Sequence, residues 1–282
     1  MIKLIECPRD AMQGWPNFIP TAVKIKYLNI LLKVGFDTLD FGSFVSPTAI
    51  PQMQDTDVVL AGLDLAQTET KLLAIVANLR GAEKATGFPG ITYLGFPLSL
   101  SETFQKRNTN KSVADAFTVL AQMQDLCFRH GKTLVVYLSM GFGNPYGELW
   151  NPNIVLDFVQ HLLPLQVSVI SLADTIGVAE PATIRYLFTE LVPAFPGITF
   201  GAHLHTRPDN WEEKVNAAFK AGCQRFDGAM KGFGGCPMAN DQLVGNLATE
   251  NLISYFQNIN IPLKLNKIAL DAALAQAPAV FI

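Results

Sequence analysis

The amino-acid sequence predicts an α/β fold, a single (β/α)8 barrel that takes up residues 1–282 as one domain and carries a C-terminal helical extension. Three observations support this prediction. Eight short apolar runs alternate with helical patterns along the chain. The units recur at an even spacing of about 30–35 residues, the length of one strand–helix unit. No shift in composition marks a second domain, and no Gly-x-Gly-x-x-Gly motif follows the first strand, which disfavours a doubly wound sheet.

The predicted strands are rich in aliphatic, β-branched and aromatic residues and are bounded by glycine or polar segments. They cover Ile2–Ile5, Phe36–Phe41, Lys71–Ala77, Ile91–Phe96, Thr133–Ser139, Val167–Leu172, Ile198–His205 and Arg225–Ala229. The polar segments 7–20 and Leu98–Lys111 and the glycine-rich segment Met140–Gly147 are predicted to be loops.

The predicted helices carry apolar residues at helical spacing and have recognisable ends. Thr21 is a candidate N-cap, Gly35 stops the same helix, Asn78 can cap a short helix, and Pro181 lies near a first helical turn. The helices cover Thr21–Val34, Asp55–Ala61, Leu79–Ala85, Ser112–His130, Asn153–Leu163, Ala182–Val192, Trp211–Ala221 and Val244–Gln257. A final helix, Leu265–Ala275, lies beyond the eighth unit and forms the predicted extension.

The composition argues against several classes of protein. A formal net charge of −3, without Lys and Arg clusters interleaved with aromatics, gives no basic surface for nucleic acid. The apolar runs are short and interrupted, so none is expected to span a bilayer. Cys7, Cys127, Cys223 and Cys236 form no Cys-x-x-Cys pair, which indicates free thiols in a reducing compartment. Because Met1–Glu6 predicts a strand rather than a signal peptide, we expect a cytoplasmic protein that acts on a small molecule.

The predicted seventh strand ends in a pair of histidines. Gly201 and Ala202 leave space beside the chain, and His203 and His205 follow at a spacing of two. Successive strand residues face opposite sides, so both imidazoles share one face, roughly 6.5–7 Å apart along the chain. That arrangement suits two nitrogen ligands to one metal ion. The alternative is a pair of hydrogen-bonded core histidines.

The other polar candidates also follow or end predicted strands, and in such a barrel these ends form the active face. They are Arg9, Asp10, Asp40, Asp174, Thr175, Cys236 and Asn246. A hard divalent ion prefers oxygen ligands and accepts imidazole. Asp10, the two histidines and the side-chain oxygen of Asn246 would supply four ligands and leave two positions for substrate. Asp10 could instead be a loop-capping aspartate.

Two further side chains suit a reaction at such a metal. The guanidinium of Arg9 could stabilise a developing enolate or carboxylate oxygen, or it could form a surface salt bridge. Cys236 lies in Gly-Phe-Gly-Gly-Cys-Pro, where the glycines permit tight turns and loop movement. Its thiol could donate a proton or act as a nucleophile, or it could be a small buried apolar group.

Six blocks of sequence, in the same order, carry a resemblance to a known family. They are Pro-Arg-Asp-Ala-Met-Gln (8–13), Ser-Phe-Val-Ser-Pro…Pro-Gln-Met (43–53), Ser-Leu-Ala-Asp-Thr-Ile-Gly-Val (171–178), His-Leu-His (203–205), Gly-Phe-Gly-Gly-Cys-Pro (232–237) and Gly-Asn-Leu-Ala-Thr-Glu (245–250). From about Lys3 to Glu250 the chain resembles the 3-hydroxy-3-methylglutaryl-CoA lyase family. These lyases share a TIM barrel with isopropylmalate, homocitrate and citramalate synthases.

The resemblance implies an activity and a set of roles. Hydroxymethylglutaryl-CoA would be cleaved between C2 and C3 to acetyl-CoA and acetoacetate by a homodimer. Mg²⁺ or Mn²⁺, rather than Zn²⁺, would be held by Asp10, His203, His205 and Asn246. Arg9 would stabilise the enolate of the departing acetyl thioester, and Cys236 would close over the site as a general acid. Asp40, Asp174 and Glu6 would shape the surroundings of the metal or the proton path.

The chain departs from the family pattern at several positions. Ala11 and Met12 stand for Gly and Leu, Asp40 for Glu, and Thr206 for the Asp that follows the histidine pair. Residues 142–144 also differ. These changes leave the metal ligands in place, and leave open another 3-hydroxyacyl thioester or a free hydroxy acid as substrate.

Three other functions stay open. A synthase condensing acetyl-CoA with a 2-oxo acid is disfavoured because such enzymes generally carry further C-terminal domains, whereas this sequence ends soon after the barrel. Metal hydrolases with a barrel fold commonly place His-x-His on the first strand rather than the seventh. A non-catalytic barrel that binds metal is the last alternative.

Overall fold

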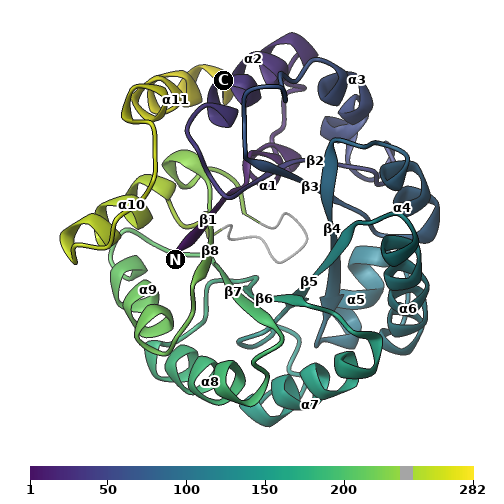
Figure 1. The fold of residues 1–282 in the computed structure, drawn as a ribbon. Helices are drawn as coiled ribbons and strands as arrows, with labels where there is room; N and C mark the ends of the chain where they lie inside the picture. Colours follow the sequence, from purple (N-terminus) through teal and green to yellow (C-terminus); the bar gives the residue numbers. More distant parts are fainter. Residues whose placement is uncertain (236–243) are drawn as a thin grey trace.

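The computed structural model describes residues 1–235 and 244–282, and its eight parallel strands close into a barrel in the order β1-β2-β3-β4-β5-β6-β7-β8 (Figure 1). The strands are β1 (Lys3–Glu6), β2 (Thr38–Ser43), β3 (Lys71–Ile75), β4 (Ile91–Ser99), β5 (Thr133–Ser139), β6 (Val169–Asp174), β7 (Thr199–Leu204) and β8 (Arg225–Gly228). The predicted barrel is confirmed, and every predicted strand is present within a few residues of its expected bounds.

Most of the helices surround the strands as an outer ring, and α1 lies inside this ring, near β2 (Figure 1). The helices are α1 (Pro8–Gln13), α2 (Thr21–Leu32), α3 (Thr56–Ala61), α4 (Leu79–Thr86), α5 (Glu102–Thr109), α6 (Val113–Arg129), α7 (Pro152–Leu162), α8 (Pro181–Ala194), α9 (Trp211–Lys220), α10 (Thr249–Asn258) and α11 (Lys267–Val280). The predicted C-terminal extension is α11, which packs against α2; the backbone N–H of Asn266 donates to the carbonyl of Val34 over 2.8 Å.

Three helix predictions were wrong. The expected loop 7–20 contains α1, which begins at Pro8 and buries the charged Arg9 and Asp10 beside the apolar Ala11 and Met12, so its six residues show no apolar stripe. The expected loop Leu98–Lys111 contains α5, a polar helix capped by Ser101, whose hydroxyl accepts the N–H of Phe104. The helix expected over Val244–Gln257 begins only at Thr249.

The backbone before α10 is extended because it pairs with the end of β7. The N–H of Thr206 donates to the carbonyl of Gly245 over 3.0 Å, and the N–H of Leu247 donates to that of Leu204 over 3.1 Å. His205 therefore lies just beyond β7, in an antiparallel bridge to Asn246. This short pairing brings the two predicted ligands together.

The apolar core has two parts. A large cluster fills the space between the strands and the helices, and a small one inside the barrel contains Leu73, Val135 and Tyr137. Buried charged groups, including Arg225 and Asp227 of β8, also lie within the structure.

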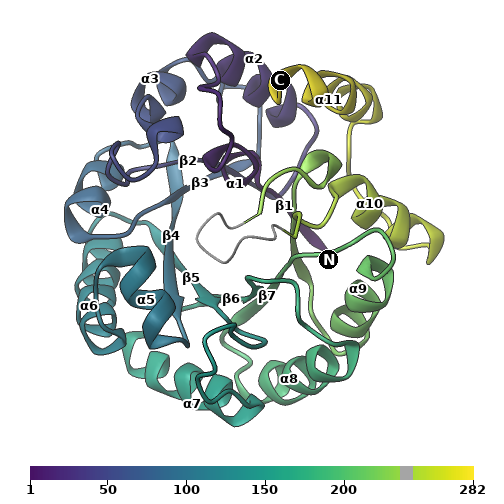
Figure 2. The same ribbon diagram turned by 180° about the vertical axis from the view of Figure 1, so that it is seen from behind.

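Figure 2 views the barrel from the side on which α1 and α5 lie in front, the side where the strands end.

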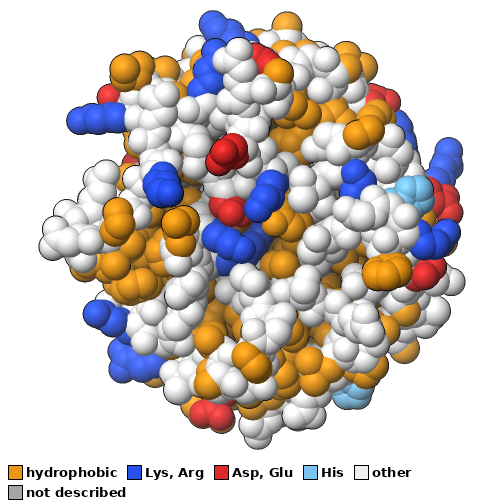
Figure 3. Space-filling view, viewed as in Figure 1, with side chains coloured by type: hydrophobic (Ala, Val, Ile, Leu, Met, Phe, Trp, Pro, Cys, Tyr) orange, Lys and Arg blue, Asp and Glu red, His pale blue; other side chains and the backbone are white. Residues whose placement is uncertain are grey.

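The surface and the helices agree with the composition. Figure 3, viewed as in Figure 1, shows basic and acidic side chains dispersed among hydrophobic and other groups, with basic groups near the middle lying beside acidic ones. Within residues 1–235 and 244–282, no helix combines the length and the apolar character needed to cross a bilayer.

Candidate metal centre and active site

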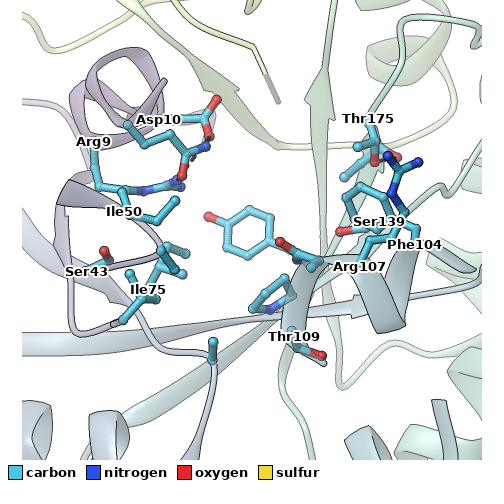
Figure 4. Close-up of a pocket in the computed structure, with 18 of the residues that line it drawn as sticks. Arg9, Asp10, Ser43, Ile50, Ile75, Phe104, Arg107, Thr109, Ser139 and Thr175 are labelled. Carbon is cyan, nitrogen blue, oxygen red and sulfur yellow. Dashed lines mark hydrogen bonds and ion pairs between the residues drawn. The ribbon is translucent and has the colours of Figure 1, made fainter. Parts of the chain in front are cut away.

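A cavity of about 490 Å³ opens at the carboxyl ends of the strands, where the barrel fold places active sites. Figure 4 shows Arg9 and Asp10 on one side of it and Thr175, Ser139 and Arg107 on the other. His203 and His205 also line it. The cavity thus collects side chains from the segments that follow β1, β4, β6 and β7.

Three of the predicted metal ligands converge in this cavity. Asp10, His203 and His205 each offer one ligand atom, and these atoms all lie within 4.8 Å of one another. Asp10 comes from the first turn of α1, which Pro8 begins directly after β1. The two imidazole rings have centroids 5.4 Å apart, as expected for residues on one face of a strand end. One divalent cation could contact all three groups.

His205 has the chemistry of a metal ligand. Its Nδ1 lies 3.0 Å from the carbonyl oxygen of Thr175, which can only accept, so Nδ1 carries the proton and Nε2 a lone pair. Nε2 is buried and has no hydrogen-bond partner among the described residues. Burial, helped by the charge of His203, lowers the pKa of His205 to about 4. A neutral imidazole with an unused buried lone pair fits a cation in the cavity.

His203 is oriented by a carboxylate instead. Its Nδ1 lies 3.2 Å from Oδ2 of Asp227, and Oδ1 of Asp227 accepts from Arg225 over 2.9 Å. Burial alone would lower the pKa of His203, but the hydrogen bond and charge of Asp227 outweigh it and raise that pKa. This carboxylate–histidine arrangement fixes the ring and leaves Nε2 as the ligand atom.

Cys7, His203 and Asp227 form a second group with ligand atoms within 4.8 Å of one another. Burial raises the pKa of the Cys7 thiol well above its ordinary value, with the charge of Asp227 adding to the effect. A protonated thiol is a poor ligand, and Asp227 is already paired with Arg225. The group containing Asp10 is therefore the better metal centre.

Asn246, the fourth predicted ligand, lies beside Asp10. Its Nδ2 donates to Oδ2 of Asp10 over 2.8 Å and to the carbonyl oxygen of Phe233 over 2.9 Å. Both contacts use the amide nitrogen, so the amide oxygen is the atom left for a cation. Gly234 packs against the same group, since a Cβ there would lie 3.0 Å from that nitrogen and 2.8 Å from the carbonyl oxygen of Asp10.

Arg9 is bound to two carboxylates. Its Nη2 lies 2.5 Å and its Nε 3.1 Å from Oδ2 of Asp40, and Nη1 donates to Asp10 over 3.0 Å and to Gln13 over 2.9 Å. Within the described residues, one N–H of Nη2 is left over for a substrate oxygen. Burial opposes ionisation of both carboxylates, yet the pKa of Asp10 is lowered by Arg9 and the histidines. The pKa of Asp40, the more deeply buried carboxylate, rises to about 6 despite Arg9.

The remaining predicted residues lie elsewhere. Glu6 does not line the cavity; its carboxylate accepts from the N–H of Met230 over 2.9 Å and from the hydroxyl of Thr249 over 2.5 Å. Burial raises the pKa of Glu6 to about 8. Asp174 is buried against Lys214, over 2.8 Å, and also lies outside the cavity lining. Cys236 lies outside the described residues.

Sequence reasoning missed several residues that support the site. Gln13 bridges Arg9 and Asp10, since its Nε2 donates to Oδ1 of Asp10 over 2.7 Å. Asp227 and its partner Arg225 could have been found, because their spacing of two on β8 places both on one face. The carbonyl of Thr175 carries no sequence signal, because every residue type has one.

Comparisons with known proteins agree with this geometry. Residues 2–275 match the model of the family described as HMGL-like. The chain is 34% identical over 268 residues to a hydroxymethylglutaryl-CoA lyase of Bacillus subtilis, covering 94% of this chain and 88% of that one. It is 30% identical over 275 residues to an (R)-citramalyl-CoA lyase of Chloroflexus aurantiacus, covering 94% and 86%.

Solved structures give the same grouping. An HMG-CoA lyase from Acinetobacter baumannii, in complex with coenzyme A and 3-methylmalate, superposes with a TM-score of 0.92 at 29% identity, covering 100% of this chain and 91% of that one. An HMG-CoA lyase from Pseudomonas aeruginosa gives 0.90 at 29% identity, covering 99% and 92%.

Proposed function

Because this chain belongs to the HMGL-like family, we propose that it is a divalent-metal-dependent lyase that cleaves a carbon–carbon bond of a 3-hydroxyacyl-CoA. The proposed substrate is hydroxymethylglutaryl-CoA, which would give acetyl-CoA and acetoacetate. The observation that carries the proposal is the buried Nε2 of His205, which has no hydrogen-bond partner in residues 1–235 and 244–282 and lies with His203 and Asp10 at the edge of one cavity.

The donor set supports Mg²⁺ or Mn²⁺ as the ion. Asp10 and the amide oxygen of Asn246 would contribute oxygen, which favours Mg²⁺ or Mn²⁺, and the two histidines would contribute nitrogen, which these ions tolerate and Zn²⁺ also accepts. When bound, such a cation would polarise the oxygens of the substrate and favour loss of its hydroxyl proton.

Arg9 is the proposed stabiliser of the leaving enolate. Cleavage sends the electron pair of the C2–C3 bond toward the thioester carbonyl, so negative charge develops on that oxygen. Arg9 stays protonated because Asp40 and Asp10 outweigh burial and raise its pKa, and its remaining N–H can donate to this oxygen. Its ion pairs hold the guanidinium in place before substrate arrives, so little reorganisation is needed.

Two protons must move in this reaction. The substrate hydroxyl loses one, which a nearby carboxylate or water could accept; Asp10 lines the cavity as such a carboxylate. The enolate carbon gains one, and Cys236 is the proposed donor, as expected from its place in the glycine-rich motif. Asp40, Asp174 and Glu6 are proposed to act on the surroundings of the site, since none of them lines the cavity.

The outer part of the cavity can take the coenzyme A portion of the substrate. Arg107 and Lys111, at and beyond the end of α5, line it and offer positive charge to phosphate groups. Arg107 lies 5.6 Å from the ring centroid of Tyr146, which supports its guanidinium. The complex of the A. baumannii lyase with coenzyme A supports this assignment.

A second substrate, (R)-citramalyl-CoA, is favoured by one observation: a lyase for it is 30% identical to this chain over nearly its whole length. Its cleavage between C2 and C3 would give acetyl-CoA and pyruvate. The two candidates share the chemistry above and differ in the group attached to C3.

The test is to incubate the purified protein with each thioester and Mg²⁺ and to measure acetoacetate and pyruvate. We expect acetoacetate from hydroxymethylglutaryl-CoA, no product after EDTA treatment, and recovery on adding Mg²⁺ or Mn²⁺. Pyruvate alone would keep the reaction and replace the substrate. Release of free thiol from acetyl-CoA and a 2-oxo acid, without cleavage of either thioester, would replace the lyase with a synthase.

We also propose a homodimer located in the cytoplasm. Support for the dimer comes from the family resemblance and from Ile268 and Ile282, which stay exposed although α11 packs against α2. Light scattering that gives the mass of one chain at micromolar concentration would refute the dimer.

A further inference from the structure

Lys214 lies on α9, outside the cavity, and is buried, with 1% of its surface exposed. Its Nζ reaches three oxygens: Oδ2 of Asp174 at 2.8 Å, the carbonyl of Gly177 at 3.0 Å and the carbonyl of His205 at 3.1 Å. An ammonium has three N–H donors, and all three are used. This ion pair joins α9, the end of β6 and the residue that follows β7.

The contacts of Lys214 bear on His205 from two directions. The ammonium holds the backbone carbonyl of His205, while the carbonyl of Thr175, next to Asp174, holds its ring nitrogen. The other oxygen of Asp174 accepts the N–H of Ala179 over 3.0 Å, which fixes the carboxylate in the loop after β6. The backbone and the ring of His205 are therefore both held by contacts that involve the loop after β6.

The same loop also touches the segment that carries Asn246. Gly177 has φ +72°, and a Cβ there would lie 2.8 Å from a methyl carbon of Val244, so the two backbones approach closely. Val244 leads into Gly245 and Asn246, which pair with Thr206 and His205. Lys214 thus contacts, directly or through Gly177, the segments that present two of the four proposed ligands.

Burying a lysine and an aspartate together removes two charges from water, and an apolar pair of similar volume often gives equal or greater stability. Stability alone is therefore a weak reason for this pair. Neither residue lines the cavity, so neither contacts the substrate.

We infer that Lys214 and Asp174 are positioning residues that hold His205 and the Asn246 segment in the geometry of the metal centre. The inference rests on the proposed function, because it needs a cation at that centre. Loss of a partner in the outer shell of a metal site typically weakens metal affinity by about 10–100-fold.

The experiment measures Mn²⁺ binding to the metal-free full chain by isothermal titration calorimetry, together with thermal unfolding. Lys214→Met removes all three donors but leaves Asp174 buried and unpaired, so it can fail to fold. The double variant Lys214→Met/Asp174→Asn removes both charges and is the decisive one. The matched control is Lys24→Met/Asp55→Asn, a second lysine–aspartate pair in which Lys24 is buried and Asp55 half-buried, with Nζ 2.7 Å from the carboxylate, and neither residue lines the cavity.

We expect the Kd for Mn²⁺ to rise at least roughly tenfold in Lys214→Met/Asp174→Asn and to stay within about twofold of the original in the control, at comparable melting temperatures. The Mn²⁺ concentration that gives half-maximal cleavage should rise in parallel. An unchanged Kd in the double variant would reduce the pair to a structural role and overturn the inference. If the unaltered protein itself binds no Mn²⁺, the proposed metal centre fails, and that result is distinct from the first.

Discussion

The two sides of the cavity hold their functional groups by different interactions. On the carboxylate side, Arg9, Asp10 and Asp40 are joined by direct ion pairs between side chains. On the histidine side, His203 is held by a carboxylate and His205 by a backbone carbonyl. The first arrangement sets charge, and the second sets which nitrogen carries the proton.

The carboxylate side shows that one guanidinium does not fix the pKa of its partners. Arg9 contacts both Asp10 and Asp40, yet the pKa of Asp10 is lowered and that of Asp40 rises to about 6. Burial raises both, but Asp10 also receives the fields of two histidines and a hydrogen bond from Asn246. A charge substitution on the carboxylate side is therefore expected to change the ionisation of Asp10 and Asp40, whereas a substitution on the histidine side is expected to change the geometry of the ligands.

The largest expected effect separates the two sides. His205→Ala should weaken Mn²⁺ binding by roughly 100-fold or more, because it removes a proposed ligand whose lone pair no other described residue uses. Arg9→Met should lower kcat by roughly 10²–10³-fold through loss of enolate stabilisation. Because Arg9 hydrogen-bonds the ligand Asp10 but is not itself a ligand, its replacement should raise the Kd for Mn²⁺ by roughly 10–100-fold, less than the replacement of His205. Calorimetry and steady-state kinetics on both variants test this.

An Arg9→Met variant that loses Mn²⁺ binding as fully as His205→Ala would contradict the separate roles of the two sides. It would mean that the two sides act as one unit, with Asp10 unable to present its carboxylate once Arg9 is gone.

The sequence could predict the barrel because each strand carries an apolar run and each following helix a periodic pattern. It could predict the pairing of His203 with His205 because strand alternation places residues two apart on one face. Its place after the eighth strand made Asn246 a candidate ligand, and the structure places it beside Asp10.

The supporting contacts could not be predicted in the same way. Lys214 contacts Asp174, 40 residues away, and Arg9 contacts Asp40, 31 residues away, so only the closed fold brings them together. Several acceptors, such as the carbonyl of Thr175, are backbone atoms without a sequence signature. The helix α1 was missed because its buried residues include charged ones, and its only visible signal is Pro8.

A smaller effect is expected at Gly234, which packs on the carboxylate side. Its φ is +89°, and a Cβ there would lie 2.6 Å from Cα of Ala11 and 2.8 Å from the carbonyl of Asp10. Gly234→Ala should therefore displace Asp10 and lower kcat roughly tenfold or more. Steady-state kinetics at saturating Mn²⁺ measures this.

Gly131 provides the control for backbone strain. Its φ is +62°, but nothing lies within 4 Å of an added Cβ. Gly131→Ala should lower the free energy of unfolding by about 1 kcal/mol and leave kcat unchanged. Equal loss of kcat in both variants would assign the Gly234 effect to general destabilisation rather than to the carboxylate side.

The last prediction concerns stability rather than activity, at Glu6, the final residue of β1, which has no ion-pair partner in the described structure. Burial raises its pKa to about 8 from an ordinary value of 4.5, and Thr249 and Met230 oppose this only in part. Between these pH values the folded chain keeps a proton that the unfolded chain has lost. The free energy of unfolding should therefore fall as pH rises from about 5 to 8, by a few kcal/mol at most.

Glu6→Gln isolates this contribution, because an amide does not titrate and can still accept the N–H of Met230. Urea unfolding of the original protein and the variant at several pH values gives the difference between their free energies of unfolding. The contributions of His205 and of other groups that both proteins share cancel in this difference. We expect the original protein to lose stability relative to the variant as pH rises. If the difference in unfolding free energy does not change between pH 5 and 8, Glu6 is ionised in the folded chain. Burial alone would then not keep the Glu6 carboxyl protonated.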